Sequence, residues 1–229
     1  LGKETLHIPK QAKYIGYEAF KSDRLKTVSV DPENPYFQLV DGNLYNSTMR
    51  MLYFVPRDCP QLFVSSEVRY IDLTILARKF ESVVVSNDNP VFKVRDGVLY
   101  DRNRVIYICP NVHSVYLHSD ADVLSLCEME RISYLREIRI SKDHPQFRAI
   151  DNVIYNKDGT NLVYIPTGIQ TVRFPNQLTS LKRAQFKECA DLKEIYIHQN
   201  TKFNARSFIG LNDKCRVFVH IDEKNIELP

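Results

Sequence analysis

Side chains that could carry out catalysis occur one at a time along the chain. The six histidines are His7, His113, His118, His144, His198 and His220. Neither the HExxH motif of zinc hydrolases nor the GxSxG motif of serine hydrolases occurs. A nucleophile also needs a base within about 3 Å, and no local motif supplies that pair. We therefore expect no enzymatic activity and no catalytic residue.

The cysteines and acidic residues do not form a metal-ligand pattern. The five cysteines, Cys59, Cys109, Cys127, Cys189 and Cys215, form no CxxC pair. Asp41, Asp96 and Asp151 each precede a glycine or an asparagine, which is typical of a turn rather than of a calcium loop. We expect no metal and no cofactor, although calcium dependence stays open. We interpret Cys189 and Cys109 as buried structural thiols.

The composition excludes two further classes of partner. The chain of 229 residues has 31 basic and 28 acidic side chains, a balance of +3, and no concentrated basic footprint of the kind that binds nucleic acid. No apolar run approaches the roughly 18 residues of a membrane span, so we expect no direct membrane insertion. Seven glycines are few for phosphate-binding loops.

The elements that position these residues follow from an internal repeat. Three tetrapeptides that begin at Asn34, Asn89 and His144 lie 55 residues apart and share Pro at their second position and Phe at their fourth. Three pentapeptides keep the same spacing: Asp41–Tyr45, Asp96–Tyr100 and Asp151–Tyr155. Agreement between independent anchors in one register indicates a repeat architecture. The Asp-Gly and Asp-Asn pairs predict tight β-hairpins.

A second pattern, apolar-x-x-apolar-x-apolar, alternates with these hairpins. Its four copies are Leu25-Val28-Val30, Phe80-Val83-Val85, Leu135-Ile138-Ile140 and Leu192-Ile195-Ile197. The alternation at the end of each copy predicts a half-buried strand. If one such strand per repeat stacks on its neighbours as a parallel sheet, the equivalent positions form three core ladders. Short helical turns are expected at Glu18–Phe20 and Ala184–Phe186.

These motifs resemble a known family. The segment Leu181-x-x-Ala184-x-Phe186-x-x-Cys189-x-x-Leu192-x-x-Ile195-x-Ile197 is similar to the core of the BspA-type leucine-rich repeat of bacterial and protozoan surface proteins. The segment from Ile8 to Val30 is similar to the same core. In the second copy Ile75 and Leu76 replace the Ala-Phe pair, and Cys127–Glu130 has no clear counterpart in the third.

The resemblance implies a repeat solenoid: a β-dominated leucine-rich-repeat superhelix, right-handed, with short helical turns and hairpins. We expect one leucine-rich-repeat domain over residues 1–229. Its copies are expected near residues 6–60, 61–114, 115–170 and 171–199, followed by a degenerate copy at 200–220. The resemblance further implies a protein-binding, adhesin-like module at the cell surface or outside the cell, which would contact extracellular-matrix, host or neighbouring-cell proteins.

The outward side chains of the repeated strands are the candidate binding residues. They alternate with the core positions and comprise Thr27, Ser29, Ser82, Val84, Glu137, Arg139, Glu194, Tyr196 and His198. Tyr and Arg are enriched in binding hot spots, so Arg139 and Tyr196 are the preferred anchors. Two alternatives remain: an intracellular scaffold that uses the same face, and a carbohydrate-binding protein. The latter would use the tyrosine rows Tyr45/Tyr100/Tyr155 and Tyr53/Tyr107/Tyr164, or a pair of carboxylates in a cleft.

Overall fold

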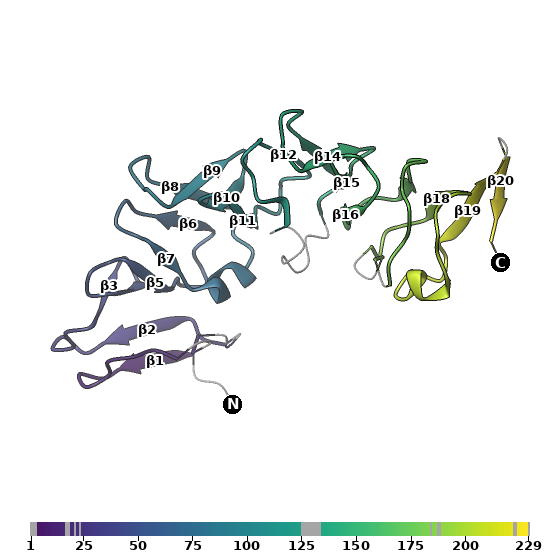
Figure 1. Ribbon diagram of the computed structural model, residues 1–229. Coiled ribbons are helices and arrows are strands. Elements are labelled where there is room, and N and C mark those ends of the chain that lie inside the picture. Colours follow the sequence, from purple (N-terminus) through teal and green to yellow (C-terminus); the bar gives the residue numbers. More distant parts are fainter. Residues whose placement is uncertain are drawn as a thin grey trace. The chain divides into compact units, whose positions relative to one another are not determined.

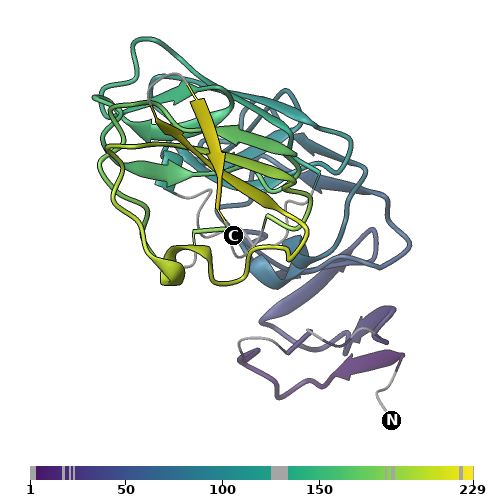
Figure 2. The ribbon, with the colours of Figure 1, turned by 90° about the vertical axis from the view of Figure 1, so that its right-hand side faces the viewer.

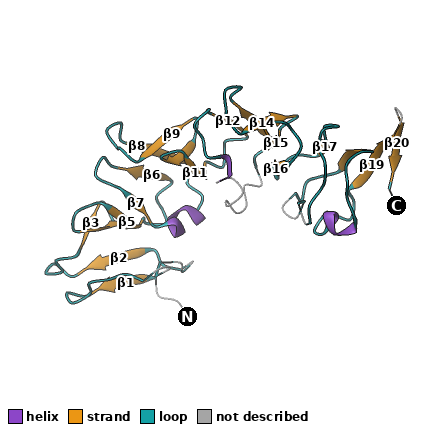
Figure 3. Cartoon of the chain, in the orientation of Figure 1, coloured by secondary structure: helices purple, strands orange, loops and turns teal. Residues whose placement is uncertain are grey.

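The computed structural model describes residues 4–16, 19–20, 22, 24–124, 134–183, 185–186, 189–221 and 224–228. The chain divides into two compact units, Leu1–Arg102 and Asn103–Pro229. Short strands and turns account for most of each unit, and the helices are single turns (Figure 3). The segment Cys127–Glu130 and the residues Glu18 and Ala184, which the sequence analysis singled out, lie outside the described residues.

The first unit contains ten strands and one helical turn among its described residues. They are β1 (Thr5–Ile8), β2 (Thr27–Val30), β3 (Phe37–Val40), β4 (Asn43–Asn46), β5 (Met51–Phe54), β6 (Gln61–Val64), β7 (Tyr70–Ile71), η1 (Leu73–Ala77), β8 (Ser82–Val85), β9 (Phe92–Arg95) and β10 (Val98–Asp101). Strands β1 and β2 pair in parallel, as do β6 and β8, and β5 and β7. Strands β3, β4 and β5 form an antiparallel meander, and β9 pairs antiparallel with β10.

The second unit repeats the same arrangement. Its elements are β11 (Arg104–Ile108), β12 (Ser114–Leu117), β13 (Glu137–Ile140), β14 (Phe147–Ile150), β15 (Val153–Asn156), β16 (Leu162–Tyr164), β17 (Thr171–Arg173), β18 (Glu194–His198), η3 (Ala205–Phe208), β19 (Arg216–Ile221) and β20 (Lys224–Glu227) (Figure 1). Strands β12 and β13 are parallel, and β14, β15 and β16 form a meander. The last sheet has the order β17-β18-β19-β20, and Figure 2 views this unit from the end that carries β20.

The four predicted strands are present, but their pairing differs from the expectation that successive copies stack directly on one another. Val83 pairs with Leu62, and Ile195 pairs with Val172, so the partner strand lies 21 to 23 residues upstream. One turn of the repeat is therefore about 22 residues long, and each 55-residue copy contributes two parallel strands and a meander. The fold class is a β-dominated repeat solenoid, as the sequence predicted.

Burial confirms two of the three core ladders. Leu25, Phe80, Leu135 and Leu192 are at most 4% exposed, and Val28, Val83, Ile138 and Ile195 at most 7%. In the third ladder only Ile197 is fully buried, whereas Val30, Val85 and Ile140 are partly exposed. The reason is the pairing: β18 has a parallel strand on both sides, while β2, β8 and β13 each have one parallel partner.

The three predicted hairpin turns are confirmed. Asp41 and Gly42 have φ values of 50° and 76°, and Asp96 and Gly97 have the same pair of values. Asp151 and Asn152 have values of 48° and 66°. Positive φ at both central residues is the requirement of the type I′ turn, whose twist matches that of the flanking strands. The turn thus accounts for the recurrent aspartates.

The asparagine at the start of each NPxF motif is a buried hydrogen-bonding plug. The Asn89 side chain donates from Nδ2 to the carbonyl oxygens of Ser65 (2.7 Å) and Val68 (3.0 Å). Its Oδ1 accepts from the backbone amides of Val91 and Phe92, both at 2.8 Å. The plug therefore ties one turn of the solenoid to the preceding turn, and Asn34 makes the equivalent four bonds.

In the third copy a histidine replaces this asparagine and keeps most of its bonds. His144 is 3% exposed, and its Nε2 lies 3.0 Å from the carbonyl oxygen of Ala121. Its Nδ1 accepts from the amides of Gln146 (3.3 Å) and Phe147 (3.1 Å). This pattern requires the proton on Nε2, because a carbonyl can only accept. His144 is thus a structural side chain rather than a site residue.

Candidate binding face

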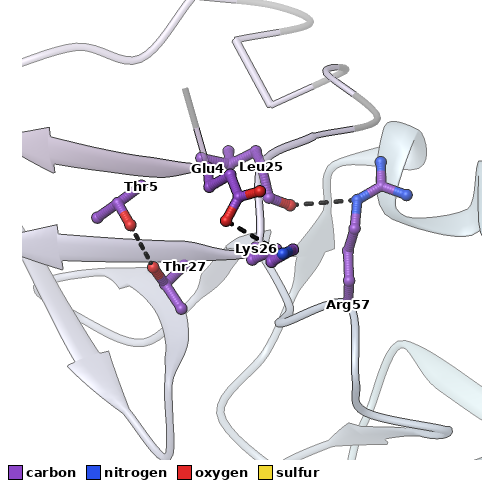
Figure 4. Close-up of polar contacts among 6 residues, drawn as sticks. All are labelled: Glu4, Thr5, Leu25, Lys26, Thr27 and Arg57. Carbon is purple, nitrogen blue, oxygen red and sulfur yellow. Dashed lines mark hydrogen bonds and ion pairs between the residues drawn. The ribbon is translucent and has the colours of Figure 1, made fainter. Parts of the chain in front are cut away.

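At the start of the first unit the predicted face is occupied by hydrogen bonds within the unit. The hydroxyls of Thr5 and Thr27 are 3.0 Å apart, and His7 Nδ1 lies 3.0 Å from the hydroxyl of Ser29. Lys26 forms an ion pair with Glu4 at 3.1 Å on the same edge, where the Arg57 side chain donates to the carbonyl oxygen of Leu25 (Figure 4). The predicted residues Thr27 and Ser29 therefore belong to a small polar network.

The next parallel pair in this unit presents an apolar contact to solvent. Phe63 on β6 and Val84 on β8 are register partners, and they are 52% and 42% exposed. The Ser82 hydroxyl accepts a hydrogen bond of 2.9 Å from the Gln61 amide. Val84 is thus accessible as predicted, and Phe63 is an accessible neighbour that the sequence analysis did not name.

In the second unit the face becomes charged and aromatic. Arg139 on β13 donates to Glu137 on the same strand, with Nε to Oε1 at 2.7 Å. The Ser114 hydroxyl and then Arg139 hold the pKa of Glu137 below its ordinary value by hydrogen bonding to the carboxylate. Tyr116 is the register partner of Arg139 and is 47% exposed. Both line a shallow open hollow together with Lys142.

The last sheet carries a continuous stack of side chains across three parallel strands. Arg173, Tyr196 and Phe218 are register partners on β17, β18 and β19. The Arg173 guanidinium carbon lies 3.7 Å from the centre of the Tyr196 ring. The Tyr196 and Phe218 rings are stacked, with centres 4.9 Å apart and an interplanar angle of 15°. Tyr196 is therefore held between two planar groups.

Glu194 fixes the edge of this stack. Its carboxylate accepts a hydrogen bond of 3.1 Å from the Tyr196 hydroxyl and pairs with Arg216 on the neighbouring strand. Arg216 also lies over the Phe218 ring, with its guanidinium carbon 5.3 Å from the ring centre. The network joins two strands and restricts the rotamers of all four side chains, which are partly exposed. Glu194 thus has a positioning role on this face.

His198, the last predicted site residue, lies beside the stack. Its ring centre is 6.2 Å from that of His220, its register partner on β19. His220 Nδ1 is 3.1 Å from the side-chain oxygen of Asn225. Within the described part of the chain, no group of three or more His, Cys, Asp or Glu side chains is arranged to hold a metal ion.

The sequence analysis missed three side chains that the structure places with the predicted ones. Tyr116, Arg173 and Phe218 occupy the same central outward position as Arg139 and Tyr196, but on strands β12, β17 and β19. Those strands carry the same apolar alternation, so the signal was present. Only the four longer motif copies were searched for outward residues, and the intervening parallel strands were omitted.

The tyrosine rows are part of the core and offer no surface for a sugar. Tyr45, Tyr100 and Tyr155 are at most 4% exposed, and Tyr107 is 6% exposed. Burial and then the negative charge of Asp41 raise the pKa of the Tyr45 hydroxyl. The carbohydrate alternative based on these rows is therefore wrong: the rings pack inside the repeats. Cys109 and Cys189 are 2% exposed, which confirms their interpretation as buried thiols.

No helix among the described residues is long and apolar enough to cross a membrane. No curated protein was found to match the chain. Three solved structures are similar to it. The pneumococcal vaccine antigen PcpA shares 15% identity, with 87% of this chain and 46% of that chain covered and a TM-score of 0.39.

The other two structures are a leucine-rich repeat protein from Eubacterium ventriosum and a leucine-rich cell surface protein from Faecalibacterium prausnitzii. The first shares 16% identity over 86% of this chain and 61% of that chain, with a TM-score of 0.44. The second shares 18% over 86% and 55%, with a TM-score of 0.42. The chain thus spans about half of these structures' length, from 46% to 61%.

A family model agrees with the repeat spacing. Residues 159–216 match the model described as BspA type leucine rich repeat region (6 copies). The matched segment includes β17, β18 and the motif from Leu181 to Ile197 on which the resemblance rested. The chain therefore carries BspA-type leucine-rich repeats, matched at residues 159–216, as its sequence predicted.

Proposed function

We propose that the chain is a protein-binding module whose contact face is the outward side of the parallel strands in the second unit. The observation that carries the proposal is the central outward position of β12, β13, β17, β18 and β19. These five positions hold Tyr116, Arg139, Arg173, Tyr196 and Phe218. Tyr and Arg are the residue types that dominate binding hot spots, and aromatic residues in general are enriched at interfaces.

The geometry also lowers the cost of binding at this face. Ordering an exposed, rotamer-rich side chain at an interface costs about 0.5–1.5 kcal/mol. Tyr196 is already held between Arg173 and Phe218, and its hydroxyl is hydrogen-bonded to Glu194. Arg139 is similarly held by Glu137. A partner would meet side chains whose conformations are largely fixed, so less of its contact energy is lost to ordering.

The partner class follows from the family resemblance. A module of BspA-type repeats is expected at the cell surface or outside the cell, where it would contact host or neighbouring-cell proteins in an adhesin-like role. This assignment rests on analogy between repeat proteins, whereas the position of the contact face rests on the named side chains. The two parts of the proposal can therefore be tested separately.

A binding screen with paired variants tests both parts. The purified chain is passed over a panel of extracellular-matrix proteins, a panel of cytosolic proteins and a glycan array. The test variant is Arg139→Ala/Tyr196→Ala. The control variant, Tyr14→Ala/Arg206→Ala, removes the same two residue types at exposed positions outside the face. The proposal predicts saturable protein binding that the test variant loses and the control keeps.

Two results would contradict the proposal. Protein binding that survives in the test variant would place the contact elsewhere on the chain. Saturable glycan binding without protein binding would replace the partner class altogether. Binding confined to the cytosolic panel would keep the contact face but favour an intracellular scaffold over the surface role.

A further inference from the structure

The three arginines of the contact face differ in how their charge is compensated. Arg139 is paired with Glu137, and Arg216 is paired with Glu194. Arg173 forms no ion pair with any carboxylate of the described residues, and its recorded contact is the stacking on Tyr196. Around the last sheet, two arginines and one glutamate leave one positive charge without a partner. That charge is on Arg173.

Stacking fixes the orientation in which this charge is presented. The guanidinium covers one face of the Tyr196 ring at 3.7 Å, and Phe218 covers the other face. Side chains stand roughly perpendicular to a sheet, so rings stacked between neighbouring strands turn their edges to solvent. Ring edges carry partial positive charge, whereas ring faces carry partial negative charge. The surface at this point is therefore electropositive, with planar N–H donors beside apolar ring edges.

We infer that Arg173 receives a carboxylate side chain, Asp or Glu, of the protein that the face binds. The carboxylate would accept two parallel N–H bonds from the guanidinium, and its neighbour in the partner would rest on the edges of Tyr196 and Phe218. This inference rests on the proposed function and adds the chemistry of the partner. The partner segment is acidic with an adjoining apolar residue.

The same geometry disfavours other occupants of this position. A sugar ring stacks on an open aromatic face, and both faces of Tyr196 are covered. A phosphate group carries nearly two negative charges at neutral pH, whereas Arg173 supplies one uncompensated positive charge. Glu227 is the register partner of Phe218 and adds a nearby negative charge. A singly charged carboxylate matches this balance better than a phosphate does.

A double-mutant cycle on a selected peptide tests the pairing. A random heptapeptide library displayed on phage is selected on the immobilised full chain, with Arg173→Ala as the counter-surface. We expect the recovered peptides to be enriched in Asp or Glu next to an apolar residue. For a recovered peptide, Arg173→Ala and a Glu→Gln (or Asp→Asn) change in the peptide should each weaken binding by about tenfold or more.

The cycle separates direct pairing from a general charge effect. If the two groups pair, the isosteric amide peptide binds the wild-type chain and the Arg173→Ala variant almost equally. Arg173→Lys should keep only part of the affinity, because lysine retains the charge but not the planar donors or the stacking. The matched control Arg206→Ala removes one exposed positive charge outside the face and should change the affinity less than twofold.

Other outcomes distinguish this inference from the proposed function. Peptides without acidic enrichment that still lose binding in Arg139→Ala/Tyr196→Ala would overturn the carboxylate assignment and leave the contact face intact. A recovered peptide whose phosphoserine version binds more tightly than its glutamate version would also overturn the assignment. Protein binding that neither Arg173→Ala nor the double variant affects would refute both, because the contact would then lie off this face.

Discussion

The asparagine plug offers the sharpest test of how neighbouring turns are held together. Asn89 is 5% exposed and makes four hydrogen bonds, two as donor and two as acceptor. A typical intramolecular hydrogen bond contributes about 0.5–1.5 kcal/mol, so Asn89→Ala should cost about 2–6 kcal/mol of unfolding free energy. Globular domains have about 5–15 kcal/mol in total, so the first unit should become marginal.

Three variants make the measurement specific. Asn87→Ala removes an exposed asparagine two residues away and should change stability by less than about 0.5 kcal/mol. Asn89→Asp keeps an acceptor for the amides of Val91 and Phe92. At neutral pH it brings a carboxylate oxygen against the two carbonyls that Nδ2 satisfied, so it should be at least as destabilising as alanine. His144→Asn introduces the side chain used in the other copies and should be nearly neutral.

Urea unfolding followed by circular dichroism and hydrogen exchange gives the readout. The asparagine-plug argument predicts a lower midpoint for Asn89→Ala and faster exchange at the amides of Val91 and Phe92. Exchange in the second unit should be unchanged. If Asn89→Ala and Asn87→Ala have the same midpoint and the two amides keep their protection, the plug contributes nothing and the reasoning fails.

Three further predictions concern the second unit. Ile195→Ala should lose about 2–5 kcal/mol in urea unfolding, because Ile195 is fully buried, while exposed Val84→Ala should lose less than about 1 kcal/mol. Ser114→Ala should raise the carboxyl pKa of Glu137, measured by NMR titration, more than Arg139→Ala does. Since the folded pKa is depressed, the linked stabilisation is present above the ordinary pKa and is lost as pH falls through the folded value. Burial and then Glu194 raise the pKa of the Cys215 thiol to about 11, so mass spectrometry should find Cys215 largely unmodified by iodoacetamide at pH 8 until urea is added.

Much of the fold could be predicted because each repeated residue type meets a local demand. Asp-Gly and Asp-Asn satisfy the positive φ of a type I′ turn, and alternating apolar residues mark half-buried strands. These demands depend on neighbours in the sequence, so they are visible in it. The core positions of the first two ladders were predictable for the same reason.

The pairing of strands was harder to predict, because it depends on which repeat period corresponds to one turn. The 55-residue repeat is conspicuous, whereas the 22-residue offset between Leu62 and Val83 is shared by strands of different sequence. The role of Asn34 and Asn89 was also missed, since their partners lie in the preceding turn and depend on that offset. His144 shows why: an imidazole meets the same demand with different atoms, so the residue type alone does not reveal the function.

The arrangement of the contact face follows from the number of neighbours that each strand has. In β12 and β13 the central outward residue has one parallel neighbour, so Tyr116 and Arg139 are each restrained from one side only. Among the described strands, β18 alone has a parallel partner on both sides, and its central residue Tyr196 is accordingly stacked on both faces. Solvent-facing positions are free to vary without disturbing the core, whereas their rigidity is set by the sheet. A strand with two parallel neighbours therefore makes an exposed aromatic side chain rigid enough to act as an anchor, and Tyr196 is the residue that meets this condition.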